Sequence, residues 1–315
     1  MSKVKVGVIG VGYLGQHHVR IFSEIPQVEL LGVCDVNLKR AKEIASIYNV
    51  PFVTDNYKDL LDKIEAVSIV TPTISHFQIA KDFLEKGIHT FIEKPVTYNL
   101  REAEILLDIA SGKDLVLQVG HIERFNPAVQ ELKKYIKNPF YIEARRMGPF
   151  DGRSTDVGVV MDLMIHDLDI LFYILGKNRK IIDINGIGYS IYTPHEDFAT
   201  VNILFEGDVF VNLIASKVSP KKLRKLDIHE KNGDQIIVDY IEQSISIVHG
   251  GAQHIESSLE SPVLEREEPL RLELEHFVRC ILEGKDPEVT LEDGKLALAL
   301  ATEILKELKV FDFKK

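Results

Sequence analysis

The chain has 315 residues and a formal net charge of −10 at pH 7, with 45% hydrophobic and 27% charged residues. This length allows two domains with a substantial core, and the acidic balance argues against nucleic acid as a partner, because phosphate binding needs a basic surface. Two cysteines, Cys34 and Cys280, indicate neither a disulfide framework nor a cysteine-rich metal site. Since no secretory or membrane-spanning apolar run is visible, we expect a cytoplasmic protein with no membrane contact.

The first part of the chain alternates short apolar runs with helical patterns, which predicts β–α units on a parallel sheet. The expected strands cover residues 3–9, 29–34, 66–70, 90–92 and 115–119, and the expected helices cover residues 14–24, 38–48, 75–85 and 100–111. Asn37 and Asn99 are placed to cap two of these helices at their N-termini. Gly87 and Gly112 close two of them at their C-termini.

The first apolar run leads directly into Gly10-x-Gly12-x-x-Gly15, and a helix-compatible stretch follows. In this context Gly10 permits a tight turn, Gly12 lets a phosphate approach the main chain, and Gly15 lets the helix pack close to the strand. The helix N-terminus would then present backbone amides to a pyrophosphate. We therefore predict that Gly10, Gly12, Tyr13, Leu14 and Gly15 bind a dinucleotide. The alternative is a purely structural glycine-rich turn.

Asp35 ends the next apolar run and lies twenty residues beyond Gly15. Its carboxylate can accept hydrogen bonds from the ribose diol of adenosine and would repel a 2′-phosphate, so the sequence favours NAD over NADP. Lys39 and Arg40 follow closely and could offset that repulsion. NADP therefore stays possible as a cofactor.

Polar residues follow the third expected strand. Thr71, Pro72 and His76 occupy the turn and the start of the next helix, where we expect them to line the adenosine side of the cofactor. A simple helix cap by Thr73 or Ser75 explains the turn equally well.

Glu93, Lys94 and Pro95 follow the fourth expected strand. Because ligands bind beyond the carboxyl ends of strands in open α/β sheets, Glu93 and Lys94 are expected to face the cofactor crevice. A lysine there can stabilise a developing oxyanion. A surface lysine at a strand end is the alternative, and a cis bond between Lys94 and Pro95 is conceivable.

The second part of the chain is rich in strands. They are expected over residues 141–146, 181–191, 200–205, 209–215, 225–230, 235–239 and 244–248, with helices over residues 158–175, 269–282 and 291–308. Turn signals between neighbouring strands indicate antiparallel hairpins. The predicted fold is α/β followed by α+β: a Rossmann domain over residues 1–121, then a domain over residues 122–315 with a large, mostly antiparallel open sheet and flanking helices. One face of that sheet is expected to form a homodimer or homotetramer.

The segment 118–127 joins the two expected domains, and a junction is a natural ligand cleft. His121, Arg124 and Asn126 offer polar contacts for a substrate there. The alternative is a strand end followed by a helix that Pro127 begins.

Asp162 and His166 are four residues apart on an expected helix, so their side chains share one face. The carboxylate can orient the imidazole, which would act as a general base for a hydroxyl proton. A helix-stabilising Asp–His pair is one alternative. A metal site that adds Asp167 and Asp169 is another, which we disfavour because no further His or Cys cluster completes it. We expect no metal.

Arg145, Arg146 and Arg153 flank a short stretch just before this helix. Three arginines beside a cleft in an acidic protein could clamp a diphosphate in a bidentate manner. Pairing with surface carboxylates is an equally open interpretation.

Taken together, the motifs resemble those of the glucose–fructose oxidoreductase, inositol dehydrogenase and MocA family (Gfo/Idh/MocA). The resemblance covers nearly the whole chain in order and rests on the glycine turn, Thr71-Pro72 with His76, Glu93-Lys94-Pro95, Gly120-His121 with Arg124-Phe125, and Asp162-x-x-x-His166. It implies a Rossmann domain, a C-terminal domain with a large sheet, and oxidation of a sugar or polyol by NAD(P). It also implies that Lys94, Asp162 and His166 form the catalytic group.

Residues 121–127 and 145–153 look like those of members that oxidise the 3-hydroxyl of UDP-N-acetyl sugars. The resemblance therefore implies a nucleotide-activated sugar as substrate, with contacts from His121, Arg124, Asn126, Arg145 and Arg153. An inositol, polyol or free-sugar dehydrogenase is the alternative within the family. Outside this class, a non-catalytic NAD-binding regulator and a metal-dependent hydrolase stay open.

Overall fold

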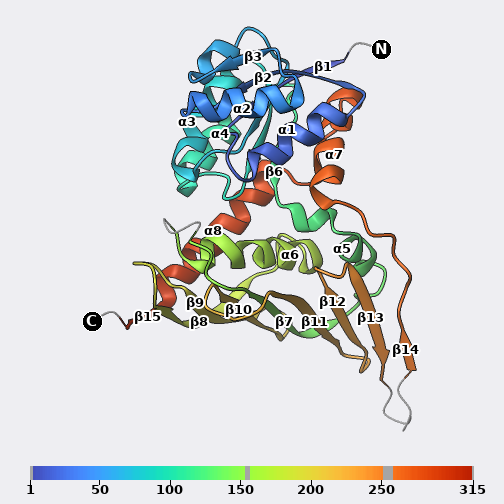
Figure 1. Ribbon diagram of the computed structural model, residues 1–315. Coiled ribbons are helices and arrows are strands. Elements are labelled where there is room, and N and C mark those ends of the chain that lie inside the picture. The colour runs from blue at the N-terminus through green and yellow to red at the C-terminus, as the bar shows by residue number, and fades with distance from the viewer. Residues whose placement is uncertain (1–2, 153–156, 251–257, 314–315) are drawn as a thin grey trace. The chain divides into compact units, whose positions relative to one another are not determined.

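The computed structural model describes residues 3–152, 157–250 and 258–313 (Figure 1). The chain forms two compact units, Met1–Ile122 with Glu268–Lys295, and Glu123–Glu267 with Leu296–Lys315. Of the helices in the described residues, none combines the length and the apolar character needed to cross a lipid bilayer.

The first unit contains a parallel six-stranded sheet in the order β3-β2-β1-β4-β5-β6. Its strands are β1 (Val4–Ile9), β2 (Val28–Cys34), β3 (Phe52–Thr54), β4 (Ala66–Ile69), β5 (His89–Glu93) and β6 (Leu117–Gly120). Its helical segments are α1 (Gly15–Glu24), α2 (Leu38–Tyr48), η1 (Tyr57–Leu60), α3 (Thr73–Glu85), α4 (Leu100–Ala110) and α7 (Pro269–Glu283). This is the strand order of a Rossmann domain, as predicted. The order reverses between β1 and β4, and ligands bind beyond the carboxyl ends of the strands at such a point.

Local signals explain most of these elements. Helix α2 covers the predicted residues, and its predicted cap is confirmed because the side chain of Asn37 accepts a hydrogen bond from the Arg40 amide. Asn99 caps α4 in the same way, accepting from the Glu102 amide. The prediction did not include β3, which has 3 residues. So short a run carries almost no periodic signal.

Segment 268–295 lies in the first unit, so the compact units differ there from the predicted ranges 1–121 and 122–315. Leu274 and Phe277 of α7 are buried in the same core as Val19 and Phe22 of α1. The ring of Phe277 also lies edge-on to that of Phe91, with 5.8 Å between centroids. The amphipathic pattern of α7 predicts a buried face but does not say which sheet covers it.

The second unit contains a nine-stranded sheet in the order β14-β13-β12-β11-β7-β10-β9-β8-β15. β7 is parallel to β10 and β15 is parallel to β8, whereas the other neighbours are antiparallel, which confirms the expected mostly antiparallel open sheet. Its strands are β7 (Pro139–Met147), β8 (Ile181–Ser190), β9 (Phe198–Phe205), β10 (Val209–Ser216), β11 (Leu223–Glu230), β12 (Gln235–Asp239), β13 (Ser244–His249), β14 (Ser258–Glu260) and β15 (Leu308–Asp312).

Helices pack against one face of this sheet (Figure 1). They are α5 (Pro127–Leu132), η3 (Val160–Met164), α6 (Ile165–Leu175) and the part of α8 (Leu291–Glu307) from residue 296 onward. Strand residues that point toward the helices are buried, and alternate residues on the other face are half-buried or exposed. This alternation follows from the two-residue period of a strand.

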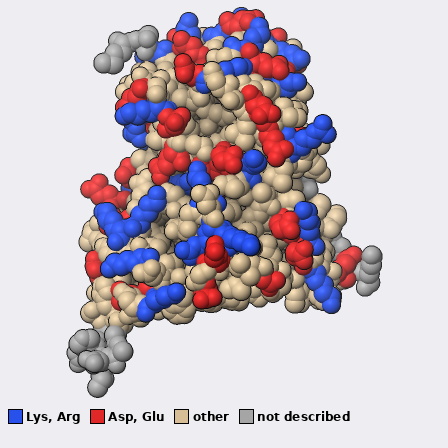
Figure 2. All heavy atoms as spheres, turned by 180° about the vertical axis from the view of Figure 1, so that it is seen from behind, with Lys and Arg blue, Asp and Glu red and all other residues tan. Residues whose placement is uncertain are grey.

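Charged side chains of both signs occur on the face that Figure 2 shows. On the face in Figure 2, Lys and Arg are interspersed with Asp and Glu.

Candidate functional site

The glycine turn between β1 and α1 has the geometry of a phosphate-binding loop. Gly10 has a φ of +84°, and a Cβ atom there would lie 2.4 Å from the carbonyl oxygen of Val70. A Cβ atom on Gly15 would lie 1.9 Å from the carbonyl oxygen of Gly10, whereas Gly12 has nothing within 4 Å. Two glycines thus allow close packing of the main chain, and the third leaves its side of the turn open to a ligand.

Tyr13 and Leu14 complete the turn. Both side chains are exposed, at 66% and 39%. Leu14 is the N-cap residue of α1 and makes no side-chain cap, because an apolar side chain offers no acceptor. A bound anion would supply such an acceptor at this end of the helix.

Asp35 follows β2 and its carboxylate is fixed at both oxygens. Oδ2 accepts a hydrogen bond from the Val11 amide and Oδ1 accepts one from the Asn37 amide, each at 2.9 Å. Arg40, which could offset this charge, donates to the Val11 carbonyl and to Gln16, and its Nη1 lies 3.1 Å from Glu43. The guanidinium is therefore engaged on α1 and α2.

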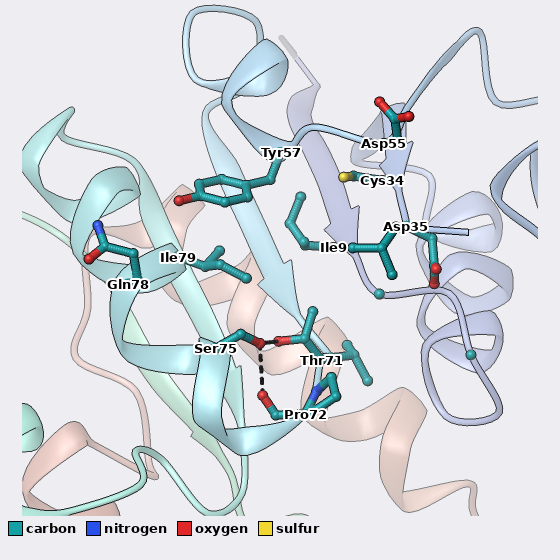
Figure 3. Close-up of a pocket in the computed structure, with 14 residues that line it drawn as sticks. Ile9, Cys34, Asp35, Asp55, Tyr57, Thr71, Pro72, Ser75, Gln78 and Ile79 are labelled. Atoms are coloured by element: carbon teal, nitrogen blue, oxygen red, sulfur yellow. Dashed lines mark hydrogen bonds between the residues drawn. The ribbon is translucent and has the colours of Figure 1, made fainter. Parts of the chain in front are cut away.

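A cavity of about 420 Å³ opens at the carboxyl ends of β1, β2 and β4 (Figure 3). Five predicted cofactor residues line it: Gly10, Gly12, Asp35, Thr71 and Pro72. The cavity lies at the point where strand order reverses, so a dinucleotide fits here both by chemistry and by topology. Tyr13, Leu14, Gly15, His76 and Glu93 are not among its lining residues.

Tyr57 and Gln78 also line this cavity, and the sequence analysis did not predict them (Figure 3). The Tyr57 hydroxyl donates a hydrogen bond to Asp82 at 2.8 Å, and the side-chain amide of Gln78 donates to the same carboxylate at 2.7 Å. Burial and the bond to Asp82 raise the pKa of Tyr57 to about 12, so the phenol stays neutral. Recognition of β3 would have drawn attention to Tyr57, because it lies just beyond that strand.

Cys34 also lines the cavity. Burial and the nearby carboxylates Asp35 and Asp55 raise the pKa of its thiol to about 12. A thiol that stays protonated is a poor nucleophile. Cys34 is therefore a small apolar wall residue.

His76 is buried behind the turn rather than in the cavity. Its Nε2 lies 2.8 Å from the Thr71 carbonyl oxygen, and its Nδ1 lies 2.9 Å from the Pro95 carbonyl oxygen. Burial lowers the pKa of His76, while the two carbonyl groups act in the opposite direction. The imidazole thus ties the turn after β4 to the turn after β5, where the bond between Lys94 and Pro95 is cis.

Glu93 is a buried carboxylate at the end of β5. Its Oε1 lies 3.2 Å from Nε2 of His18, whose Nδ1 lies 2.9 Å from the Ser68 hydroxyl. Oε2 accepts from the Lys94 amide at 3.2 Å. A Cβ atom on Gly120 would lie 2.9 Å from this carboxylate. The sequence analysis did not predict a role for His18. Its position, three residues after Gly15 on the buried face of α1, could have indicated one, because a polar residue on a buried face needs a partner.

The second unit carries Asp162 and His166 on one continuous helical segment, with both residues half-buried. The predicted helix 158–175 begins differently from expectation, because residues 160–164 form the π-helical turn η3 before α6. The ammonium of Lys217, which the sequence analysis did not single out, lies 3.6 Å from Oδ2 of Asp162.

The neighbouring carboxylates of this helix bind buried arginines. Arg146 bonds both oxygens of Asp167, at 2.8 and 3.0 Å, and its Nη1 lies 2.6 Å from Glu123. Arg124 bonds both oxygens of Asp169, at 2.5 and 2.8 Å. Burial opposes the charge of Arg146, but Asp167 and Glu123 raise its pKa above the ordinary value. Among the described residues, no three His, Cys, Asp or Glu side chains are grouped to hold a metal ion.

The predicted substrate residues lie in different surroundings. Arg145 is on the uncovered sheet face, 3.0 Å from Glu143 and 3.4 Å from Asp227, so it does not converge with its neighbour Arg146. Asn126 is buried and caps α5, accepting from the Ala128 amide. His121 is buried directly after β6. Arg153 lies outside the described residues.

The six-stranded order, the open glycine turn and the fixed acidic residue after β2 define a dinucleotide-binding protein. Residues 4–121 match an oxidoreductase family with an NAD-binding Rossmann fold, and residues 133–308 match the C-terminal alpha/beta domain of the same family. The chain belongs to the Gfo/Idh/MocA family of oxidoreductases.

Several named proteins are similar to this chain. The chain is 34% identical to UDP-N-acetylglucosamine 3-dehydrogenase of Acidithiobacillus ferrooxidans over 99% of both chains. A solved structure of that protein gives a TM-score of 0.90, covering 98% of this chain and 99% of the other. Identity to the scyllo-inositol 2-dehydrogenase (NAD(+)) of Bacillus subtilis is 29%, over 94% of this chain and 91% of that one. A levoglucosan dehydrogenase in complex with NADH and L-sorbose, 19% identical, shares the fold with a TM-score of 0.85 over 98% of this chain and 97% of the other.

Proposed function

We propose that this protein is an NAD-dependent dehydrogenase that oxidises the 3-hydroxyl of UDP-N-acetylglucosamine. The observation that carries the substrate is the 34% identity, over 99% of both chains, to a dehydrogenase of that name. The chain also keeps the ordered motifs that the catalytic assignment needs, namely Lys94 after β5 and Asp162 with His166 on one helix.

The cofactor of the proposal is NAD rather than NADP. The cavity beyond β1, β2 and β4 offers the open side of Gly12 to a pyrophosphate and the carboxylate of Asp35 to a ribose. Because the Arg40 guanidinium is already paired with Glu43 and held by Gln16 and the Val11 carbonyl, it is a poor counter-charge for a 2′-phosphate.

The proposed chemistry divides one oxidation among three side chains. His166 accepts the hydroxyl proton, Lys94 donates a hydrogen bond to the same oxygen, and Asp162 orients the imidazole. Bound NAD⁺ supplies the hydride acceptor. Glu93 supports the turn that carries Lys94, because its carboxylate lies beside His18 and accepts a hydrogen bond from the backbone amide of Lys94.

The substrate is tested by the absorbance of reduced nicotinamide, with NAD⁺ and a panel of UDP-sugars, inositols and aldoses. Reduction with UDP-N-acetylglucosamine is the expected result, with the oxidised carbon identified by NMR of the product. A response to an inositol alone would identify a polyol dehydrogenase. No response to any member of the panel, combined with measurable NAD binding, would support a binding protein without catalysis.

Replacement of the base tests the mechanism. We expect His166→Ala to lower kcat by about 10²–10⁴-fold, because it removes general-base catalysis, which corresponds to about 3–5 kcal/mol in the barrier. NAD affinity, measured by calorimetry, should stay at the wild-type value. Wild-type turnover by this variant would remove His166 from the mechanism.

The quaternary structure of the proposal is a homodimer or homotetramer formed through the uncovered face of the nine-stranded sheet. That face carries Phe210 and Ile187, which are 40% and 39% exposed. It also carries a hydrogen-bonded row of Asn185, Asn202 and Asn212 across three strands. An exposed surface that mixes aromatic, aliphatic and amide side chains is suited to association with a second copy. A cytoplasmic location stays a prediction.

A further inference from the structure

A buried lysine lies beside the proposed catalytic helix. Lys217 directly follows β10 and is only 7% exposed. Its Nζ donates to the Val157 carbonyl at 3.0 Å and lies 3.6 Å from Oδ2 of Asp162. Lysine is almost never buried unless it is paired, so this position requires an acidic neighbour.

The main chain around Lys217 is held firmly. Its amide donates to the Asp197 carbonyl at 2.8 Å. The carboxylate of Asp197 accepts hydrogen bonds from the amides of Ile191, Tyr192 and Thr193, at 2.6 to 2.9 Å. Hydrogen bonds therefore fix the main chain from which the ammonium group of Lys217 extends.

The same loop holds the start of the helix that bears Asp162. Glu196 accepts from the Val159 amide through its carbonyl at 2.9 Å, and from the Val160 amide through Oε1 at 3.0 Å. A Cβ atom on Gly158 would lie 2.0 Å from the Glu196 carboxylate, so glycine makes room for this contact. The turn thus held is the π-helical η3, a feature that recurs at functional sites.

We propose that Lys217 is a positioning residue for Asp162. Its ammonium keeps the Asp162 carboxylate charged and in one orientation, so that Asp162 can orient His166 during proton transfer. An opposite charge at this distance favours the ionised carboxylate. Arg224 on β11 also interacts electrostatically with Asp162, and Glu196 is the acidic neighbour on the same side of the turn. This inference rests on the proposed roles of Asp162 and His166.

The test compares Lys217→Met, Lys217→Arg, Asp162→Asn and the double variant Lys217→Met/Asp162→Asn in the full-length protein, with NAD⁺ and UDP-N-acetylglucosamine. We expect Lys217→Met to lower kcat by about 10²-fold, the cost of a misplaced group near the chemistry, with a much smaller change in KM. Lys217→Arg should restore most of the activity, because it keeps the charge. In the double variant, the loss should equal that of Asp162→Asn alone, because both changes remove one function.

Lys134→Met is the matched control, since its Nζ also bonds a carboxylate of this unit, Glu131 at 2.7 Å, but on the surface. It should keep wild-type kcat. Circular dichroism and NAD affinity report folding, and Lys217→Gln, which keeps a donor but no charge, replaces Lys217→Met if that variant does not fold. Wild-type kcat in either uncharged variant, or multiplicative losses in the double variant, would overturn the inference. Wild-type kcat in Asp162→Asn would instead overturn the proposed role of Asp162, and the role of Lys217 with it.

Discussion

In the proposed mode of cofactor binding, the carboxylate of Asp35, which lines the cavity, faces the adenosine ribose. It is held by two amides, and no lysine or arginine bonds it among the hydrogen bonds and ion pairs described for this residue. Its negative charge is therefore not neutralised by a direct ion pair among the contacts described for it. We therefore expect the choice between NAD and NADP to depend on Asp35 more than on any other residue of the crevice.

Asp35→Asn tests that dependence. The amide keeps one acceptor oxygen and removes the charge that repels a 2′-phosphate, at the loss of the acceptor for one of the two backbone amides that bond Asp35. We expect the ratio of kcat/KM for NAD to that for NADP to fall by about tenfold or more, since one close charge contact of this kind contributes at least about 1.4 kcal/mol. Asp62→Asn, at an exposed position paired with Lys86, is the control and should leave the ratio unchanged.

His89 shows how a buried imidazole makes stability depend on pH. Its Nδ1 accepts a hydrogen bond from the Val116 amide at 2.9 Å, which requires the neutral ring. Burial lowers the pKa of His89. The unfolded chain therefore binds more protons than the folded chain as the pH falls through the ordinary histidine range near about 6.5, and the free energy of unfolding must fall with it.

His89→Asn isolates this contribution, because asparagine can accept the same hydrogen bond but does not titrate. Between about pH 7.5 and about pH 5.5, wild-type protein should lose more free energy of unfolding than the variant, in proportion to about 1.4 kcal/mol per unit of pKa difference. Urea denaturation at both pH values measures the two losses. Equal losses would show that His89 does not contribute.

At the scale of elements, β7 shows how a strand separates the side chains of two residues that are adjacent in the sequence. Arg145 and Arg146 are neighbours, yet one faces the uncovered side and the other is 2% exposed beneath α6. Successive strand residues point to opposite faces. A diphosphate clamp formed by Arg145 and Arg146 would need both side chains on one face of the sheet. The strand places them on opposite faces.

The two arginines provide a matched pair of variants. Arg146→Met should lower the free energy of unfolding by about 3–5 kcal/mol, because Asp167 and Glu123 would lose their buried counter-charge. Arg145→Met should cost no more than about 1 kcal/mol, because its ion pairs are half exposed. Chemical denaturation followed by circular dichroism measures both. Similar losses would contradict the assignment of Arg146 to a buried network.

At the scale of the whole molecule, the described residues include a broad sheet face that carries aromatic side chains beside amide and charged ones. Phe210 of β10 stacks on Tyr141 of β7 with 6.1 Å between ring centroids. Both lie on the side opposite the helices. A second copy of the chain would bury this surface.

Phe210→Glu should shift the protein toward the mass of a single chain in light scattering, because a charge at this position would be buried without a partner in the proposed interface. The control is Ile47→Glu, which places the same charge at a 58% exposed position on α2. A wild-type protein that already has the mass of one chain would exclude this interface.

By itself the sequence determined what short-range chemistry specifies. The glycine turn, the Asn37 and Asn99 caps, the helix bounds of α2 and the alternation of the long strands follow from φ preferences, capping and periodicity, all of which act within a few residues. The identity of the family follows from the order of these local motifs along the chain.

Only the tertiary structure decided which partner each buried polar group takes. His18 with Glu93, Lys217 with Asp162, Arg124 with Asp169, and α7 with the first unit are contacts between residues far apart in the chain. Periodicity tells which face of an element is buried but not what covers it, because many surfaces can bury the same apolar stripe. The pairing of charges follows from that packing, since a buried charge is stable only beside the counter-charge that the fold brings to it.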